Sequence, residues 1–195
     1  MTDHNNNASP CCGCKVQQNK DPSRRDAIKM VSLGTWSAIP FLGSTAKAQA
    51  APLLIVDADA EQDFKPLRPS DLAVGKPMLV YPFDAKAGKP LNETRLNKMV
   101  VIRLPEDQMA PDTKSKSASS ILAYSSICTH QACDVKTWIA KEKVLACFCH
   151  ASKFDLLDGA KVVSGPAPRP LPGIALSMAG DFIAIQPGFP ANQGS

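Results

Sequence analysis

Short apolar runs separated by turn-forming residues recur along the chain between residues 77 and 190. Each run is long enough for a strand but short for a helix, and 17 prolines among 195 residues disfavour long helices. Short runs with regular turn signals predict an all-β domain. The expected strands are residues 78–81, 99–104, 121–124, 143–146, 154–157, 161–163, 174–178 and 182–185.

The segments between these runs carry weaker signals. Asp158-Gly159 stands between two expected strands and is typical of a hairpin turn. Residues 105–119 are polar and are expected to form a loop. Residues 49–76 are rich in proline and charge, so we expect an N-terminal arm there, with a short helical turn capped around Ser70. The main domain is then expected to span residues 77–190.

Residues 1–48 have the organisation of an export signal. Ser-Arg-Arg-Asp-Ala-Ile-Lys at 23–29 precedes a mildly apolar run at 30–42, and Ala-Lys-Ala follows at 46–48. This order resembles a twin-arginine signal peptide. The apolar run is shorter than the roughly 20 residues that a membrane span needs. We therefore expect cleavage near Ala48 to Ala50 rather than anchoring, and a periplasmic mature protein.

The leader also holds three closely spaced cysteines, Cys11, Cys12 and Cys14. We interpret them as part of a polar segment that is removed, although such a run could also bind a metal or take a lipid. The leader carries six Lys and Arg against three Asp, whereas the rest of the chain carries 16 against 15 acidic residues. Because a nucleic-acid-binding face needs clustered basic residues, no nucleic-acid partner is expected.

The candidate chemistry after the leader is confined to two short segments. They read Cys-Thr-His-Gln-Ala-Cys at 128–133 and Cys-Phe-Cys-His-Ala-Ser at 147–152. Each offers a thiolate and an imidazole, which suits a tetrahedral zinc site or a [2Fe–2S] cluster with two cysteines on one iron and two histidines on the other. A zinc site would not need the two additional cysteines. The candidate metal ligands are Cys128, His130, Cys147 and His150, and the additional cysteines are Cys133 and Cys149.

The two motifs resemble those of the Rieske iron–sulfur family, over about residues 123–172. The resemblance implies one [2Fe–2S] cluster on the four candidate ligands. It also implies a disulfide between Cys133 and Cys149, which joins the two cluster loops in the high-potential members. The implied fold has stacked antiparallel sheets, with a small cluster-binding subdomain inserted in a larger base. A zinc-stabilised binding module is the alternative.

Residues around the second motif are implied to tune and cover the cluster. Ser152 matches the serine that donates to a bridging sulfide, and Phe154 stands where quinol-oxidising members commonly have a donor tyrosine. Because phenylalanine has no donor, a lower reduction potential is expected. The segment with Gly165, Pro166 and Pro168 matches the proline loop that covers the cluster.

The resemblance implies an electron carrier that serves a larger redox subunit. Residues 121–128, Phe154-Asp155 and the small size resemble the small subunit of arsenite oxidase-type enzymes, which implies a molybdopterin-type partner and a soluble cytochrome c acceptor. We expect this arsenite oxidase-type complex. The alternative is the Rieske subunit of quinol–cytochrome c reductase, which residues 165–171 resemble and which implies a cytochrome b partner. Three residues depart from the usual pattern: Gln131 replaces an apolar residue, Ala132 a glycine, and Phe148 a proline.

Overall fold

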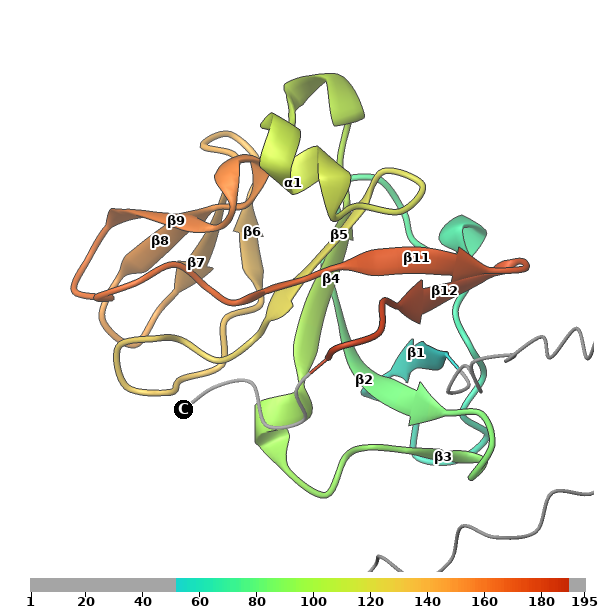
Figure 1. Cartoon of the computed structure of the whole chain (residues 1–195). Helices are drawn as coiled ribbons and strands as arrows, with labels where there is room; N and C mark the ends of the chain where they lie inside the picture. Colours follow the sequence, from blue (N-terminus) through green and yellow to red (C-terminus); the bar gives the residue numbers. More distant parts are fainter. Residues whose placement is uncertain (1–51, 190–195) are drawn as a thin grey trace, which may run out of the picture. The chain divides into compact units, whose positions relative to one another are not determined.

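The computed structural model describes residues 52–189, and the predicted leader lies outside this range (Figure 1). Within it the chain forms strands β1 to β12, one five-residue α-helix and four three-residue 3-10 turns. The strand pairs are antiparallel. The all-β prediction is confirmed. No helix in this range has the length and apolar character needed to cross a membrane.

The larger of two sheets forms a base. Its strands are β1 (Leu53–Asp57), β2 (Met78–Asp84), β3 (Lys89–Pro90), β4 (Met99–Arg103), β5 (Ile121–Ser125), β10 (Gly173–Ile174), β11 (Leu176–Ala179) and β12 (Phe182–Ile185). They are arranged in the order β10-β5-β4-β2-β1-β12-β11, and β3 pairs with β2.

The smaller sheet is an insertion in the base. It contains β6 (Thr137–Ile139), β7 (Val144–Cys147), β8 (Ser152–Asp155) and β9 (Lys161–Ser164), in that spatial order. The chain leaves the base after β5 and returns to pair with the same strand as β10. Figure 1 shows this orange sheet beside the base. The predicted small subdomain inserted in a larger base is therefore confirmed.

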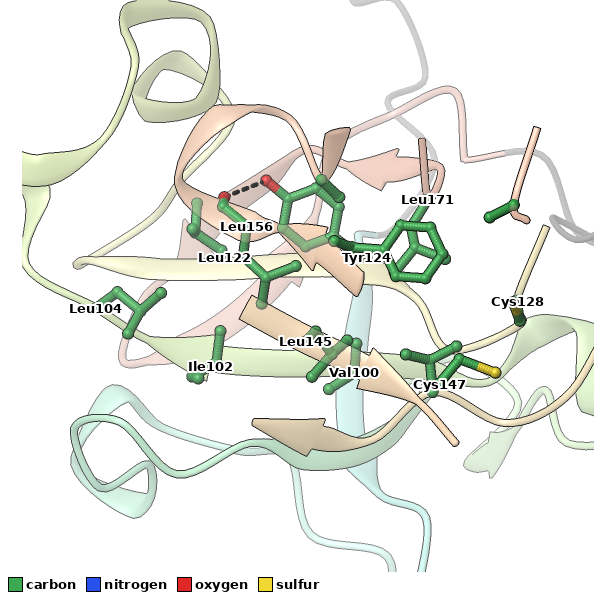
Figure 2. Close-up of a cluster of buried hydrophobic side chains, with 14 of the residues drawn as sticks. Val100, Ile102, Leu104, Leu122, Tyr124, Cys128, Leu145, Cys147, Leu156 and Leu171 are labelled. Carbon is green, nitrogen blue, oxygen red and sulfur yellow. Dashed lines mark hydrogen bonds between the residues drawn. The ribbon is translucent and has the colours of Figure 1, made fainter. Parts of the chain in front are cut away.

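Strands β4 and β5 are buried on both faces, which explains their unbroken apolar sequences. Alternate side chains of a strand point to opposite faces. Val100, Ile102, Leu122 and Tyr124 face a cluster that includes Leu145, Cys147 and Phe154 of the small sheet (Figure 2). The residues between them face a second cluster, formed with the far side of the base: Met99, Val101, Ile121, Ala123, Ile174, Leu176, Ile183 and Ile185. The first cluster thus joins the two sheets.

Tyr124 ties the two sheets with a polar contact inside this apolar cluster. Its hydroxyl donates to the carbonyl of Leu156 at 2.8 Å, shown as the dashed line in Figure 2. Burial raises the pKa of Tyr124, so the side chain remains a neutral donor at ordinary pH. A buried carbonyl without a partner would be costly, and this bond satisfies it.

The structure differs from the predicted elements in several details. Part of the expected arm forms β1, an inner strand between β2 and β12. The expected loop at 105–119 contains the 3-10 turn η3 (Glu106–Gln108) and the helix α1 (Pro111–Ser115). The capped turn near Ser70 is the 3-10 turn η1 (Pro69–Asp71), where Asp71 accepts from the backbone N–H of Arg68 at 2.8 Å. Residues 174–178 are divided between β10 and β11, while β3 and β6 lack the apolar runs that would reveal them.

Candidate metal centre

The two segments that carry the candidate ligands lie side by side at one end of the small sheet. The first loop begins just after β5, and Cys128 is 4% exposed. The second begins at Cys147, the last residue of β7, which is 1% exposed. Figure 2 places both thiols at the same end of the shared apolar cluster. Because both cysteines belong to this buried cluster, the apolar side chains around them hold their positions.

A disulfide joins the two loops. It links Cys133, at the end of the first loop, to Cys149, in the second, with Cα atoms 6.6 Å apart. The imidazoles of His130 and His150, one from each loop, meet edge to face, with ring centroids 4.7 Å apart and planes at 89°. The predicted disulfide is thus present, and it joins the two loops that carry the four candidate ligands.

The donor atoms have the environment that a bound metal would complete. Nδ1 of His130 is buried and has no hydrogen-bond partner within residues 52–189. A buried polar atom of this kind normally has a partner, so a metal ion is the natural one here. His150 is exposed, which places one imidazole at the protein surface.

The two buried thiols also have an environment that a bound cation would complete. Burial raises the pKa of Cys147, and the adjacent Cys128 raises it further, whereas the backbone N–H groups of Cys149 and His150 lower it. Two neighbouring buried thiolates would repel each other without a cation between them. Bound iron would supply that cation and deprotonate both thiols, so the residues fit the predicted cluster.

Three neighbouring cysteine sulfurs do not themselves form a metal site. The Sγ atoms of Cys133, Cys147 and Cys149 all lie within 4.8 Å of one another. Cys133 and Cys149 are bonded to each other, which leaves only Cys147 of this group able to bind as a thiolate. The short distances therefore show that the disulfide lies close to the candidate ligand Cys147.

The first loop is closed by its own backbone. The N–H of Cys128 donates to the Cys133 carbonyl at 2.8 Å, and the N–H of Ala132 donates back to the Cys128 carbonyl at 2.9 Å. Within this closed loop Ala132 adopts a left-handed conformation, with φ of 55°. Alanine adopts that conformation reluctantly, whereas the glycine usual in related motifs does so freely.

The proline-rich loop contacts both ligand loops. The N–H of Ala167 donates to Oγ of Ser152 at 3.1 Å, and Oγ1 of Thr129 donates to the Arg169 carbonyl at 2.7 Å. Gly165 has φ of +90°, and a Cβ there would lie 2.4 Å from Cα of Ser152. Glycine is therefore required for this close approach. Pro166 and Pro168 are exposed, so they form the outside of the cover.

The two predicted tuning residues are both fully buried on β8, Ser152 as its first residue and Phe154 as its third. Ser152 accepts its bond from Ala167, which leaves its own O–H able to donate toward the metal site. Phe154 lies opposite Leu145 on β7 and packs in the cluster that joins the sheets. Its packing role is therefore plain, while its tuning role stays a prediction.

Sequence reasoning missed the residues that brace the first loop from outside. Arg95 and Lys98, in the base, both bind Asp134 directly after the disulfide cysteine. Thr129 was also missed, although it stands inside the first motif. Each contact joins residues more than 30 positions apart, so no local pattern signals them.

Residues 76–175 match the family model described as the Rieske [2Fe-2S] domain. With the ligand geometry described above, this match shows that the chain belongs to the Rieske [2Fe–2S] family. A [2Fe–2S] cluster is the cofactor of this domain.

The chain is similar to proteins named as Rieske subunits of larger complexes. It is 31% identical over 172 residues to the cytochrome bc1 complex Rieske iron-sulfur subunit of Streptomyces coelicolor, covering 80% of this chain and 48% of that protein. It is 36% identical over 117 residues to the same kind of subunit from Streptomyces lividans, covering 58% and 69%. A Haloferax mediterranei protein named as the Rieske subunit of a respiratory nitrate reductase is 27% identical over 181 residues, covering 85% and 77%. The chain thus spans about half the length of the Streptomyces coelicolor subunit.

We expect Gly165→Ala to destabilise the protein more than Gly180→Ala does. Both glycines have positive φ, so both substitutions carry the left-handed cost of about 1–2 kcal/mol. At Gly165 the new methyl group also meets the Ser152 backbone, which adds about 1–3 kcal/mol for overpacking. At Gly180 nothing lies within 4 Å. Urea unfolding measures both, and equal costs would show that the proline loop has no tight contact.

We expect the two tuning residues to shift the reduction potential in opposite directions. Ser152→Ala removes a hydroxyl donor and should lower the potential, whereas Phe154→Tyr adds one and should raise it by several tens of millivolts, where about 59 mV is a tenfold change for one electron. Voltammetry measures both, with Ser164→Ala, an exposed serine on β9, as the control. If Phe154→Tyr does not change the reduction potential, residue 154 contributes to packing and does not tune the cluster.

Proposed function

We propose that this protein carries single electrons through a [2Fe–2S] cluster bound by four of its side chains. Cys128 and Cys147 would hold one iron, and His130 and His150 the other. The observation that carries the proposal is the meeting of two buried thiols and two edge-to-face imidazoles on disulfide-linked loops, with Nδ1 of His130 buried and unpaired within residues 52–189.

The protein's own residues would perform three tasks around the cofactor. When bound, a cluster with this ligand set takes up and returns one electron at a potential well above that of an all-cysteine cluster. The buried thiols and the proline loop exclude water on one side, and the disulfide keeps the two ligand loops at a constant separation. The exposed His150 provides the edge through which a partner can approach.

The ligand set favours a carrier over a catalyst. Two cysteines and two histidines complete the coordination of a [2Fe–2S] cluster and leave no open iron position for a substrate. A protein of this kind must therefore receive electrons from one partner and pass them to another. We infer that it works as a small subunit of a larger redox complex.

The relatives favour a quinol–cytochrome c reductase as that complex. Two of them are named as Rieske subunits of cytochrome bc1 complexes. By analogy the partner would be a cytochrome b subunit, with a cytochrome c as the acceptor. The sequence motifs alone favour an arsenite oxidase-type enzyme, so the relatives reverse the preference between the two complexes.

The second candidate is the small subunit of an arsenite oxidase-type enzyme with a molybdopterin subunit. Gln131 is exposed in the first loop, where a quinol-docking surface is expected to be apolar. Phe154 places no hydroxyl beside the cluster, as a lower-potential role would require. A relative named for a respiratory nitrate reductase supports the general idea that such a subunit can serve other complexes.

We also propose export to the periplasm by the twin-arginine route. The predicted signal lies outside the described residues, so the support comes from the sequence and from the disulfide. Disulfides persist in oxidising compartments and are rare in the cytosol, which agrees with a periplasmic site for the Cys133–Cys149 bond.

The purified protein should contain the cluster that the geometry fits. We expect a red-brown protein with about two irons and two acid-labile sulfides per chain, and reversible one-electron reduction. Iron and sulfide analysis with voltammetry provides the measurement, and Cys147→Ser should lose the colour. A colourless wild-type protein with one zinc would refute the proposal and support the zinc-stabilised module.

The partner and the compartment can be tested together in the source cells. A tagged full-length chain should fractionate with the periplasm or its membrane and co-purify with either a haem b protein or a molybdenum protein. Arg24→Lys combined with Arg25→Lys should abolish export by a twin-arginine route. Export that persists in this variant would refute that route, and the co-purified cofactor decides between the two complexes.

A further inference from the structure

Arg95 reaches from the base to the first ligand loop. It begins the 3-10 turn η2 (Arg95–Asn97), which Thr94 caps by accepting from the Leu96 N–H at 3.2 Å. Its Nη2 donates both to the carbonyl of Ala132 and, at 2.9 Å, to Oδ1 of Asp134. One guanidinium therefore holds the backbone immediately before Cys133 and the side chain immediately after it.

A second cation completes this attachment. Nζ of Lys98 binds the other carboxylate oxygen of Asp134 at 3.3 Å, and the Lys98 carbonyl accepts from the N–H of Ser126 at 3.1 Å. Partial burial raises the pKa of Asp134, but the hydrogen bonds and charges of Arg95 and Lys98 outweigh it and hold that pKa below its usual value. Asp134 is thus an ionised carboxylate, and each of its two oxygens contacts a cationic side chain from the larger sheet's part of the chain.

The contact of Arg95 with Ala132 falls on the strained part of the loop. Ala132 has φ of 55°, and its N–H is already used to close the loop onto Cys128. At this left-handed turn the Ala132 carbonyl accepts a hydrogen bond from the Arg95 guanidinium. Ala132 lies two residues after His130, so a loop that relaxes at Ala132 also moves this imidazole.

We propose that Arg95 is a positioning residue for the metal centre, which rests on the proposed function. It holds the ligand loop in its strained conformation, and its positive charge stabilises the reduced cluster. Added charge near a cluster shifts its potential, and a nearby cation favours the state with one more electron. Arg95 acts through the loop and through its field, and does not bind iron itself.

Three variants separate these two effects. Arg95→Gln removes the charge and the paired contact, whereas Arg95→Lys keeps the charge on a flexible donor that lacks the guanidinium's geometry. Arg103→Gln is the matched control, because Arg103 donates to the Pro69 carbonyl within the base at 3.4 Å. The readouts are the reduction potential, the rate of cluster loss to a chelator, and amide hydrogen exchange at Cys128 and Ala132 in the disulfide-bonded protein without metal.

We expect Arg95→Gln to lower the potential, by up to a tenfold change in the one-electron equilibrium or about 59 mV. It should also raise loop exchange and cluster loss, each about tenfold. Arg95→Lys should keep the wild-type potential but show faster exchange and faster cluster loss. Arg103→Gln should match wild type in all three. If Arg95→Gln fails to fold, Arg95→Lys still tests the positioning.

The inference is overturned if Arg95→Gln, or Arg95→Lys where it alone folds, matches wild type in exchange and cluster loss. It is also overturned if Arg103→Gln produces the same changes as Arg95→Gln. A wild-type protein without a [2Fe–2S] cluster would instead refute the proposed function. The exchange experiment on the metal-free protein still reports whether Arg95 braces the loop in that case, so the two failures are distinguishable.

Discussion

Two loops that rise from different strands must be held side by side before four ligands can meet, and the Cys133–Cys149 bond makes that arrangement covalent. The cost lies in the backbone, because Ala132 and Ala151 both adopt left-handed conformations, at about 1–2 kcal/mol for each residue. The proline loop supports the arrangement through Ser152, and the base supports it through Arg95. Each support contacts a different point of the two ligand loops.

Much of the fold could be predicted from sequence because the inner strands are buried on both faces. In β4 and β5 almost every position is apolar, so the strands stand out as uninterrupted runs. β1 has the same character, but its surroundings are rich in charge and proline, and these drew the interpretation toward an arm. The edge strand β6 and the two-residue β3 gave no such signal, because their side chains are mostly only partly buried or exposed.

The candidate ligands could be predicted because Cys and His are scarce and gather at a recognisable spacing. The supports of the loops could not, because their identity depends on the folded arrangement. The Arg95–Asp134 pair spans 39 positions and the Thr129–Arg169 contact spans 40. Arginine, aspartate and threonine are common surface residues, and only the packed sheets reveal which of them reach the loops.

The small sheet begins and ends at neighbouring points of the base, since the Ser125 N–H donates to the Pro172 carbonyl at 2.9 Å. Such an insertion has the connectivity of a transplantable module. Its packing shows that it is not independent. Val100, Ile102 and Leu122 of the base would face water without Leu145 and Phe154 of the insertion. The two parts share one core and should therefore melt in a single transition. Free energy gained when the tip binds its metal would then protect the base against unfolding, and cofactor loss would expose the whole domain to proteolysis.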